Sequence, residues 1–133
     1  MAYKDYMVRA TAGNAQIRAF AATTKDLAEY GRKAHNLSPI AAAALGRLMT
    51  GTVMMGTMMD NDDDLITVKM DGDGPLKGVL ATADRHGNVK GYAVNPYVIM
   101  EPNVAGHLNV GGGIGEGTLT VIRDMGLREQ IGR

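Results

Sequence analysis

The residues best suited to acid–base chemistry are few and lie far apart in the chain. The only histidines are His35, His86 and His107. None of them stands in a motif with a serine nucleophile, and no two have the spacing of metal ligands. An active site needs groups that converge, and this pattern gives no evidence of convergence. We therefore predict no catalytic residues, and a small enzyme that uses His86, His107 or Glu116 beside the glycine-rich segment 111–117 is a less favoured alternative.

An acidic run at Asp60–Asp64, with the sequence DNDDD, places carboxylates at positions one, three and five of a calcium-loop pattern. The sixth position of that pattern should be glycine but is Leu65, and the twelfth should be glutamate but is Asp71. The run is more typical of a solvated turn at the end of an apolar helix. We predict no metal site in the chain.

The segment Gly111–Gly117, with the sequence GGGIGEG, suggests a phosphate-binding loop only at first sight. It does not fit the G-x-G-x-x-G pattern in any register and has no lysine of the P-loop type. It also leads into an expected strand, whereas phosphate loops lead into a helix N-terminus. A flexible or close-packed connection is the better interpretation.

Composition excludes several further classes of function. The chain of 133 residues has no cysteine, so it can form no disulfide, thiol nucleophile or thiolate zinc site. Its formal net charge is zero, and no basic face indicates a nucleic-acid partner. The first residues, MAYKDYMVRA, lack the apolar core of a secretory signal.

The element that must organise any site is the apolar segment Ser38–Met59, which contains five methionines and a single charge, Arg47. Ser38 is a good N-cap, and Pro39 suits the first helical position. We predict a long methionine-rich helix that packing holds on most of its circumference. Arg47 splits the segment into apolar runs shorter than the about twenty residues that a membrane span needs, so we predict a soluble protein with no membrane partner.

A helical wheel divides this helix into two sides. One arc is predicted to face a sheet and carries Leu45, Leu48, Met55 and Met59. The other side carries Arg47, Thr50, Thr57, Met54 and Met58. Met54 and Met58 are either core beneath another segment or an adaptable apolar surface for a client protein or a covering segment. They are the only contact residues predicted.

The N-terminal region is predicted to be a β-hairpin. Residues 5–11 and 15–21 alternate and flank Gly13-Asn14, a pair suited to a two-residue turn. In that register Arg9 faces Arg18, a mildly destabilising pair that we expect to point into water.

The remaining pattern predicts a helix from Thr23 or Thr24 to about His35, followed by the methionine-rich helix and then by four more strands. Those strands are expected at 65–70, 79–83, 89–94 and 118–123. The fold class is α+β, a largely antiparallel sheet of about six strands covered on one side by two helices. We expect a single domain over residues 1–133.

Four segments together resemble the N-terminal domain of the 33 kDa chaperonin family. They are DYMVRATAGNAQIRAFAATT (5–24), HNLSPIAAAALGRLM (35–49), DGDGPLKGVLATADRHGNVKGYAVNP (71–96) and GEGTLTVIRDMG (115–126). The SPxAxAALGR-type helix start and the ADRHGNVKGY-type hairpin are specific when they occur together. The resemblance covers nearly the whole chain in order.

The resemblance implies a cytoplasmic, ATP-independent chaperone that binds unfolding proteins under oxidative and heat stress. In that family a C-terminal domain holds one zinc ion through four cysteines, and oxidation forms disulfides, releases zinc and exposes apolar surface. Activated members dimerise. Loss of the metal would unfold such a module because the binding energy of the zinc is also folding energy.

This chain departs from the family pattern at its end. LREQIGR (127–133) follows the last expected strand with no closing element, and no cysteine is present to bind zinc or form a disulfide. We therefore expect an incomplete N-terminal domain without the linker and zinc domain, without a cofactor of its own, and prone to self-association or homodimer formation. A structural or dimerisation module that binds no clients remains an alternative.

Overall fold

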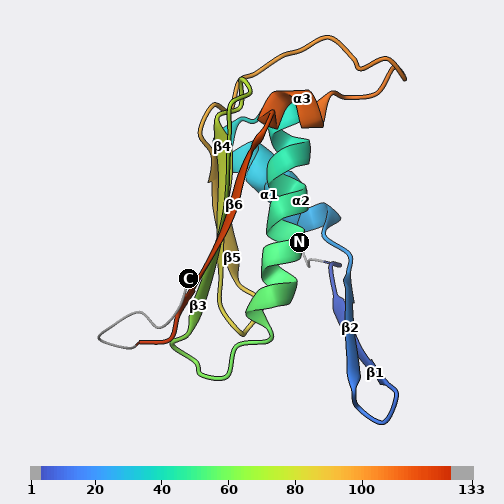
Figure 1. Ribbon diagram of the computed structural model, residues 1–133, viewed down its shortest axis with the longest axis vertical. Helices are drawn as coiled ribbons and strands as arrows, with labels where there is room; N and C mark the ends of the chain where they lie inside the picture. Colours follow the sequence, from blue (N-terminus) through green and yellow to red (C-terminus); the bar gives the residue numbers. More distant parts are fainter. Residues whose placement is uncertain (1–3, 127–133) are drawn as a thin grey trace.

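The computed structural model describes residues 4–126 (Figure 1). Along this range two strands are followed by two helices, three strands, a short helix and a last strand. The elements are β1 (Met7–Ala12), β2 (Ile17–Ala22), α1 (Lys25–His35), α2 (Pro39–Gly56), β3 (Leu65–Gly72), β4 (Gly78–Ala83), β5 (Val89–Ala93), α3 (Val110–Ile114) and β6 (Gly117–Asp124).

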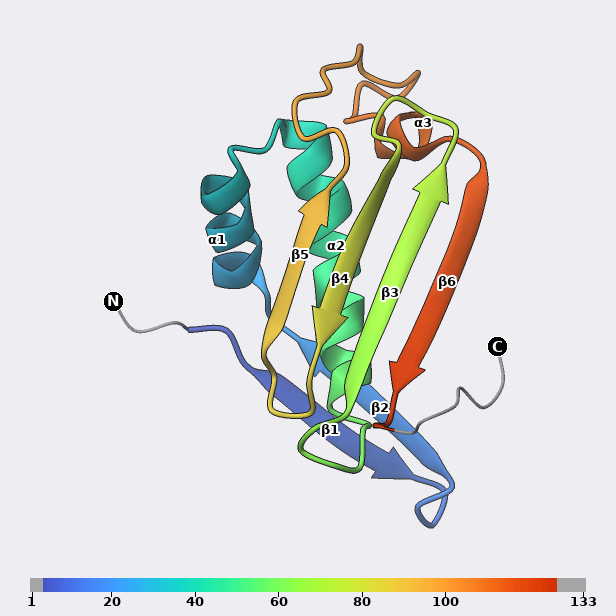
Figure 2. The same ribbon diagram turned by 90° about the vertical axis from the view of Figure 1, so that its left-hand side faces the viewer.

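The strands form two antiparallel sheets. β1 and β2 pair only with each other, and the other four strands form a sheet in the order β5-β4-β3-β6 (Figure 2). The predicted α+β class with antiparallel strands is therefore confirmed. The expected strands are divided between a hairpin and a four-stranded sheet, because no strand of the sheet pairs with β1 or β2 within residues 4–126.

The hairpin differs from its prediction in the turn. Its loop spans residues 13–16, and the predicted two-residue turn is wrong because three successive residues of this loop adopt positive φ. The longer loop moves each residue to a new partner, so Arg9 lies opposite Phe20 and Arg18 lies opposite Thr11. The predicted pair of like charges is therefore absent.

The base of the hairpin holds the start of α1. Thr24 occupies the N-cap position but makes no side-chain capping bond, and its hydroxyl lies 2.7 Å from that of Thr50 on α2. The carboxylate of Asp5 accepts a hydrogen bond of 2.8 Å from the backbone N–H of Leu27 instead. A residue that precedes the hairpin thus performs the capping that the local sequence does not.

The helix α2 starts as predicted. The Ser38 hydroxyl accepts a hydrogen bond from the N–H of Ala41, and Pro39 is the first helical residue. The hydroxyls of Thr50 and Thr52 donate to carbonyls four residues earlier, at 2.7 Å each, which satisfies them in apolar surroundings. No helix among residues 4–126 is long and apolar enough to span a membrane.

The core lies between α2 and the sheet. Its main cluster of buried apolar residues includes Leu37, Ile40, Ala41, Leu45, Met49, Leu76, Val79 and Ala81. A smaller cluster at the other end contains Met59, Ile66, Val68 and Ala83. Of the predicted sheet-facing arc, Leu45 and Met59 are buried, whereas Leu48 and Met55 are half-buried.

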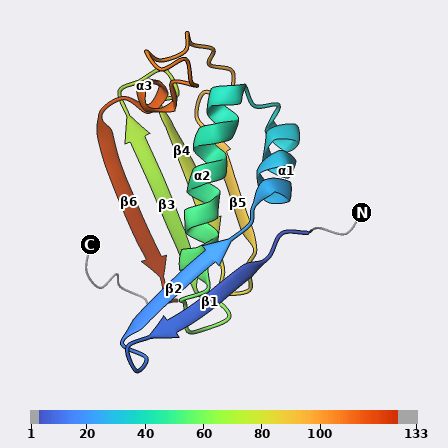
Figure 3. The ribbon, with the colours of Figure 1, turned by 90° about the vertical axis from the view of Figure 1, so that its right-hand side faces the viewer.

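Both long helices lie on one face of the sheet, here called the inner face, as predicted (Figure 3). α2 runs across the middle strands, and α1 packs beside it toward β5. β6 lies beyond the area that α2 covers. The inner face is therefore only partly covered by the described residues.

Two glycines of α2 lie in opposite surroundings. Gly56, the last residue of the helix, is buried against the end of β4. A Cβ added there would collide with the carbonyl oxygen of Asp84 and lie 3.0 Å from the Cβ of Ala83. A Cβ added to Gly51 would have nothing within 4 Å. Only at Gly56 does the close approach of helix and strand require glycine.

The glycine-rich segment forms α3, a helix that the sequence prediction missed. The side chain of Asn109 caps it by accepting a hydrogen bond of 3.0 Å from the N–H of Gly112. Gly113 is buried, and a Cβ added there would lie 2.9 Å from Ile40 and 3.1 Å from Leu76. The segment is thus a close-packed connection, which was one of the two expected possibilities.

Candidate functional site

The most distinctive surface feature is an apolar groove on the inner face, between α2 and β6. We call it the α2–β6 groove; its volume is about 360 Å³. It is lined by Ala44, Arg47, Leu48, Gly51, Thr52, Met55, Val68, Met70, Val79, Val110, Ile114 and Leu119. Strands, α2 and α3 all contribute walls, so the groove exists only in the folded chain.

The pairing of β6 with β3 creates this groove. Val121 lies opposite Val68, and Leu119 lies opposite Met70. Directly opposite residues share a sheet face, so Leu119 and Val121 project on the inner face, beside the buried Val68. They remain 55% and 42% exposed, because β6 lies past the edge of α2 (Figure 3).

The lining of the groove is almost without polar groups. Arg47 is its one charged residue, is exposed, and forms no ion pair within residues 4–126. The hydroxyl of Thr52 is already bonded to the carbonyl of Leu48. Such a surface fits apolar side chains and provides no acid, base or nucleophile.

The predicted contact residues lie outside this groove. Met54 is half-buried and Met58 is 40% exposed, and neither lines the α2–β6 groove. The wall that α2 contributes includes Leu48 and Met55, which the helical wheel had assigned to the core. Sequence reasoning therefore found the correct side of α2 for the sheet but did not show that part of that side stays open.

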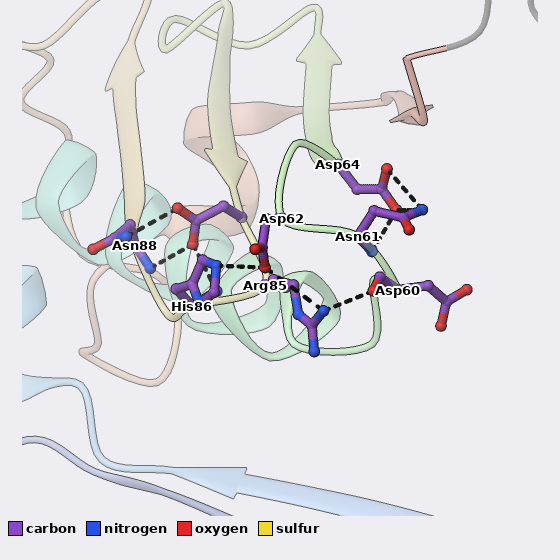
Figure 4. Close-up of polar contacts among 8 residues, drawn as sticks. Asp60, Asn61, Asp62, Asp64, Arg85, His86 and Asn88 are labelled. Carbon is purple, nitrogen blue, oxygen red and sulfur yellow. Dashed lines mark hydrogen bonds and ion pairs between the residues drawn. The ribbon is translucent and has the colours of Figure 1, made fainter.

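The acidic run, which follows the C-terminal end of α2, meets the β4–β5 turn that carries His86 (Figure 4). His86 Nε2 lies 3.0 Å from a carboxylate oxygen of Asp62, and the Arg85 guanidinium donates to the carbonyl of Asp60 at 2.7 Å. These contacts join the α2–β3 loop to the β4–β5 turn. His86, Arg85 and Asp62 are all exposed, so the cluster fastens two loops at the surface.

The carboxylate of Asp84 closes the β4–β5 turn. It accepts hydrogen bonds from the backbone N–H groups of His86 and Asn88, at 2.8 and 3.1 Å, and from the Asn88 side chain at 2.9 Å. Partial burial raises the pKa of Asp84, but the hydrogen bonds from Asn88 and His86 outweigh it and hold the pKa below its usual value of 3.8.

We expect Asp84→Ala to lower the free energy of unfolding by about 1–2 kcal/mol at neutral pH, because three hydrogen bonds are lost. A carboxylate whose pKa is lowered by folding stabilises the fold at pH values above its pKa in the unfolded chain. This stabilisation is lost as the pH falls through its pKa in the folded chain. The difference between wild type and variant should therefore shrink below pH 3.8. Urea unfolding at neutral and acidic pH measures it. A difference independent of pH would contradict the assignment.

The acidic run is only partly the solvated turn that was predicted. Asp60, Asp62 and Asp63 are exposed, but Asp64 is buried. Its carboxylate accepts hydrogen bonds from the backbone and side chain of Asn61, at 3.1 and 3.2 Å, and so closes the loop on itself. Among residues 4–126 no cluster of three histidine or acidic side chains could hold a metal ion.

The enzyme alternative requires a hollow where two of its candidate residues converge. A second hollow, of about 580 Å³, lies between the hairpin base, α1 and the β4–β5 turn. Neither it nor the α2–β6 groove is lined by His86, His107 or Glu116. The structure therefore does not bring these residues together in either hollow. The third histidine, His35, is the last residue of α1, and its side chain is exposed.

Comparison with known proteins gives a consistent result. The family model described as "Hsp33 protein" matches residues 5–132. The chain is 54% identical to a 33 kDa chaperonin of Agathobacter rectalis and 50% identical to one of Clostridioides difficile, over 94% and 95% of its length. It spans 43% and 44% of those relatives, less than half of their length.

The fold comparison agrees. The crystal structure of a 33 kDa chaperonin from Thermotoga maritima superposes with a TM-score of 0.88 at 30% sequence identity, covering 92% of this chain and 42% of that one. The named relatives are chaperonins rather than enzymes, in agreement with the prediction from the sequence. The resemblance found in the sequence is confirmed, and the chain belongs to the Hsp33 family.

Proposed function

We propose that this chain is the client-binding core of an ATP-independent holdase chaperone that acts in the cytoplasm on unfolding proteins. Membership of the Hsp33 family and the chaperonin relatives support this proposal. The observation that carries it is the α2–β6 groove, whose apolar lining continues onto exposed Leu119 and Val121. Apolar surface of this kind binds the apolar side chains that an unfolding protein exposes.

We propose regulation by oxidation and by zinc for longer members of the family and not for this chain. The chain has no cysteine, and no residue cluster in its described part fits a metal ion. Zinc therefore does not fit the residues present here. We propose that this chain binds clients with or without an oxidant, because nothing in its own sequence can respond to one by thiol chemistry.

We expect the chain to suppress the aggregation of thermally unfolding citrate synthase equally with and without a thiol-specific oxidant such as diamide. Leu119→Ser should raise the amount of chain needed for half suppression by about three- to tenfold, because apolar contact area in the groove is lost. Light scattering during heating measures both effects.

A matched control is available on the same strand. Ile122 is 43% exposed and projects on the opposite face of the sheet, because it pairs with Thr67. Ile122→Ser should leave suppression near the wild-type level. Equal losses in the two variants would show that the α2–β6 groove is not the binding surface, and no suppression by the wild-type chain would contradict holdase activity altogether.

Met54 and Met58 remain proposed contacts for a client or for a covering segment. Met58 is exposed, and methionine adapts to varied apolar partners. A homodimer is the second proposed partner state, favoured by large apolar side chains that are exposed on the hairpin or just before it, namely Tyr6, Val8 and Ile17. A dimerisation module without client binding would show one oligomeric state in light scattering and no suppression of aggregation.

A further inference from the structure

β6 is an edge strand whose outer side is open. The sheet order ends at β6, and no strand among residues 4–126 pairs with its outer side. All eight of its residues are exposed. Its pairing with β3 runs through eight successive residue pairs without a bulge, and it contains no proline. A bulge and a proline are two of the features by which native edge strands block pairing with a further strand.

The hydrogen-bonding groups on the open side can be assigned to particular residues. The N–H of Asp73 donates to the carbonyl of Glu116 at 2.9 Å, just before β6 begins. In an antiparallel pair such bonded positions recur at every second residue. Thr118, Thr120 and Ile122 therefore direct their backbone groups to β3. Leu119, Val121 and Arg123 direct theirs to the open edge.

The same residues carry side chains on the inner face. Leu119 lines the α2–β6 groove, and Val121 is next to it on the strand. A strand added beside β6 would thus place every second side chain on the inner face, next to this apolar surface. The open edge of β6 therefore combines free main-chain hydrogen-bonding groups with a neighbouring apolar surface.

The other edge of the sheet lacks this combination. β5 has only five residues against the eight of β6, and Gly91 in its middle weakens it as a template for pairing. α1 packs close to β5. The two edges therefore differ in length, sequence and neighbours, and β6 is the one suited to strand addition.

We propose that β6 captures an extended segment of an unfolded protein as a fifth strand, with alternate apolar side chains of that segment lying over the α2–β6 groove. This inference rests on the proposed holdase function and specifies how a client is held. The backbone gives affinity without sequence specificity, whereas the groove selects for alternating apolar residues. Such alternation is common in segments that form half-buried strands in folded proteins.

The charged residues beside the groove indicate which extended segments should bind most tightly. Arg47 at the groove and Arg123 on the same face of β6 are exposed and form no ion pair within residues 4–126. A segment with glutamate on the inner side should therefore bind about two- to fivefold more tightly than the same segment with lysine, the range expected for exposed ion pairs.

The test uses the full chain and a fluorescent peptide of about twelve residues that alternates valine and threonine and ends in glutamate. Amide hydrogen exchange by NMR should show new protection at Leu119, Val121 and Arg123 on binding. Thr118, Thr120 and Ile122 should already be protected in the free chain. A peptide methylated on alternate amide nitrogens, along the side that faces β6, should bind at least about tenfold more weakly, since two or three hydrogen bonds are lost.

A pair of variants tests the edge from the protein side. Val121→Pro removes an N–H that points to the open edge and keeps those that bond to β3. It should abolish peptide binding, whereas Val121→Thr, which keeps the N–H, should retain it. Circular dichroism verifies that both variants are folded, and the methylated peptide provides the same test on the wild-type chain.

Several outcomes would overturn the proposal. Equal binding of the methylated peptide would mean that side chains alone hold the segment. Protection at Leu119, Val121 and Arg123 without peptide would mean that a second copy or another part of the chain occupies the edge. Suppression of citrate synthase aggregation without peptide binding would leave the holdase function intact and refute strand addition. Peptide binding without suppression would refute the holdase function and leave strand addition standing.

Discussion

Replacing Gly56 by alanine is expected to lower the free energy of unfolding by about 1–3 kcal/mol, the usual cost of overpacking a well-filled site. The added methyl group would collide with the carbonyl oxygen of Asp84 and crowd Ala83 at 3.0 Å. Backbone atoms at the end of β4 cannot turn aside as a flexible side chain can. The collision must therefore be relieved by a shift of the helix end or the strand.

The control is the same substitution five residues earlier in α2. Gly51→Ala meets nothing within 4 Å, so it should stabilise the chain by about 0.5–1 kcal/mol through helix propensity and reduced freedom of the unfolded chain. The two variants have the same composition and the same change in side chain. Urea unfolding followed by circular dichroism should give shifts of opposite sign. Stabilisation by both substitutions would show that α2 does not approach β4 closely.

The second large effect is expected for Leu45→Ala, which should cost about 2–5 kcal/mol, the range for buried leucines. Leu45 is fully buried at the centre of the main core cluster. Its methyl group lies so close to β5 that a Cβ on Gly91 would come within 3.0 Å of it. The loss of packing and the cavity that remains both act against the fold. The cost is a large part of the ~5–15 kcal/mol by which domains are usually stable.

A matched exposed residue separates burial from side-chain chemistry. Ile99 lies in the long loop before α3 and is 85% exposed. Ile99→Ala should change the free energy of unfolding by no more than about 0.5 kcal/mol. Thermal unfolding of both variants compares them directly. A small effect for Leu45→Ala would mean that the core is formed elsewhere than between α2 and the sheet.

The elements with local signals were predictable from the sequence. Alternation identified β3, the short apolar run 79–83 and the turn after it identified β4 and β5, and Ser38 with Pro39 marked the start of α2. These signals involve residues close together in the sequence, so they can be recognised without knowing which distant segments the element contacts. The loop of the hairpin was not predictable in the same way, because Ala15 adopts a positive φ that its residue type does not favour.

Features that depend on distant contacts were missed. α3 contains three glycines, which are poor helix formers, and packing of Gly113 against Ile40 and Leu76 helps to hold it in place. The α2–β6 groove depends on the pairing of β6 with β3, which no local pattern specifies. The helical wheel showed which side of α2 meets the sheet. It could not show that the sheet extends further than the helix covers.

The single-domain organisation and the expected end of the chain stay predictions. Residues 127–133, on which the prediction of an incomplete domain rested, lie outside the described residues. The relatives matched are more than twice as long as this chain, as its coverage of 43% shows.

The capping of α1 by Asp5 has a consequence for how the molecule opens. The helix has no side-chain cap of its own, so its first turn depends on a residue on the far side of the hairpin. If the hairpin separates from the body, the N–H of Leu27 loses its acceptor at the same moment. The hairpin and the first turn of α1 therefore belong to one cooperative unit of local unfolding, although they are different elements of secondary structure.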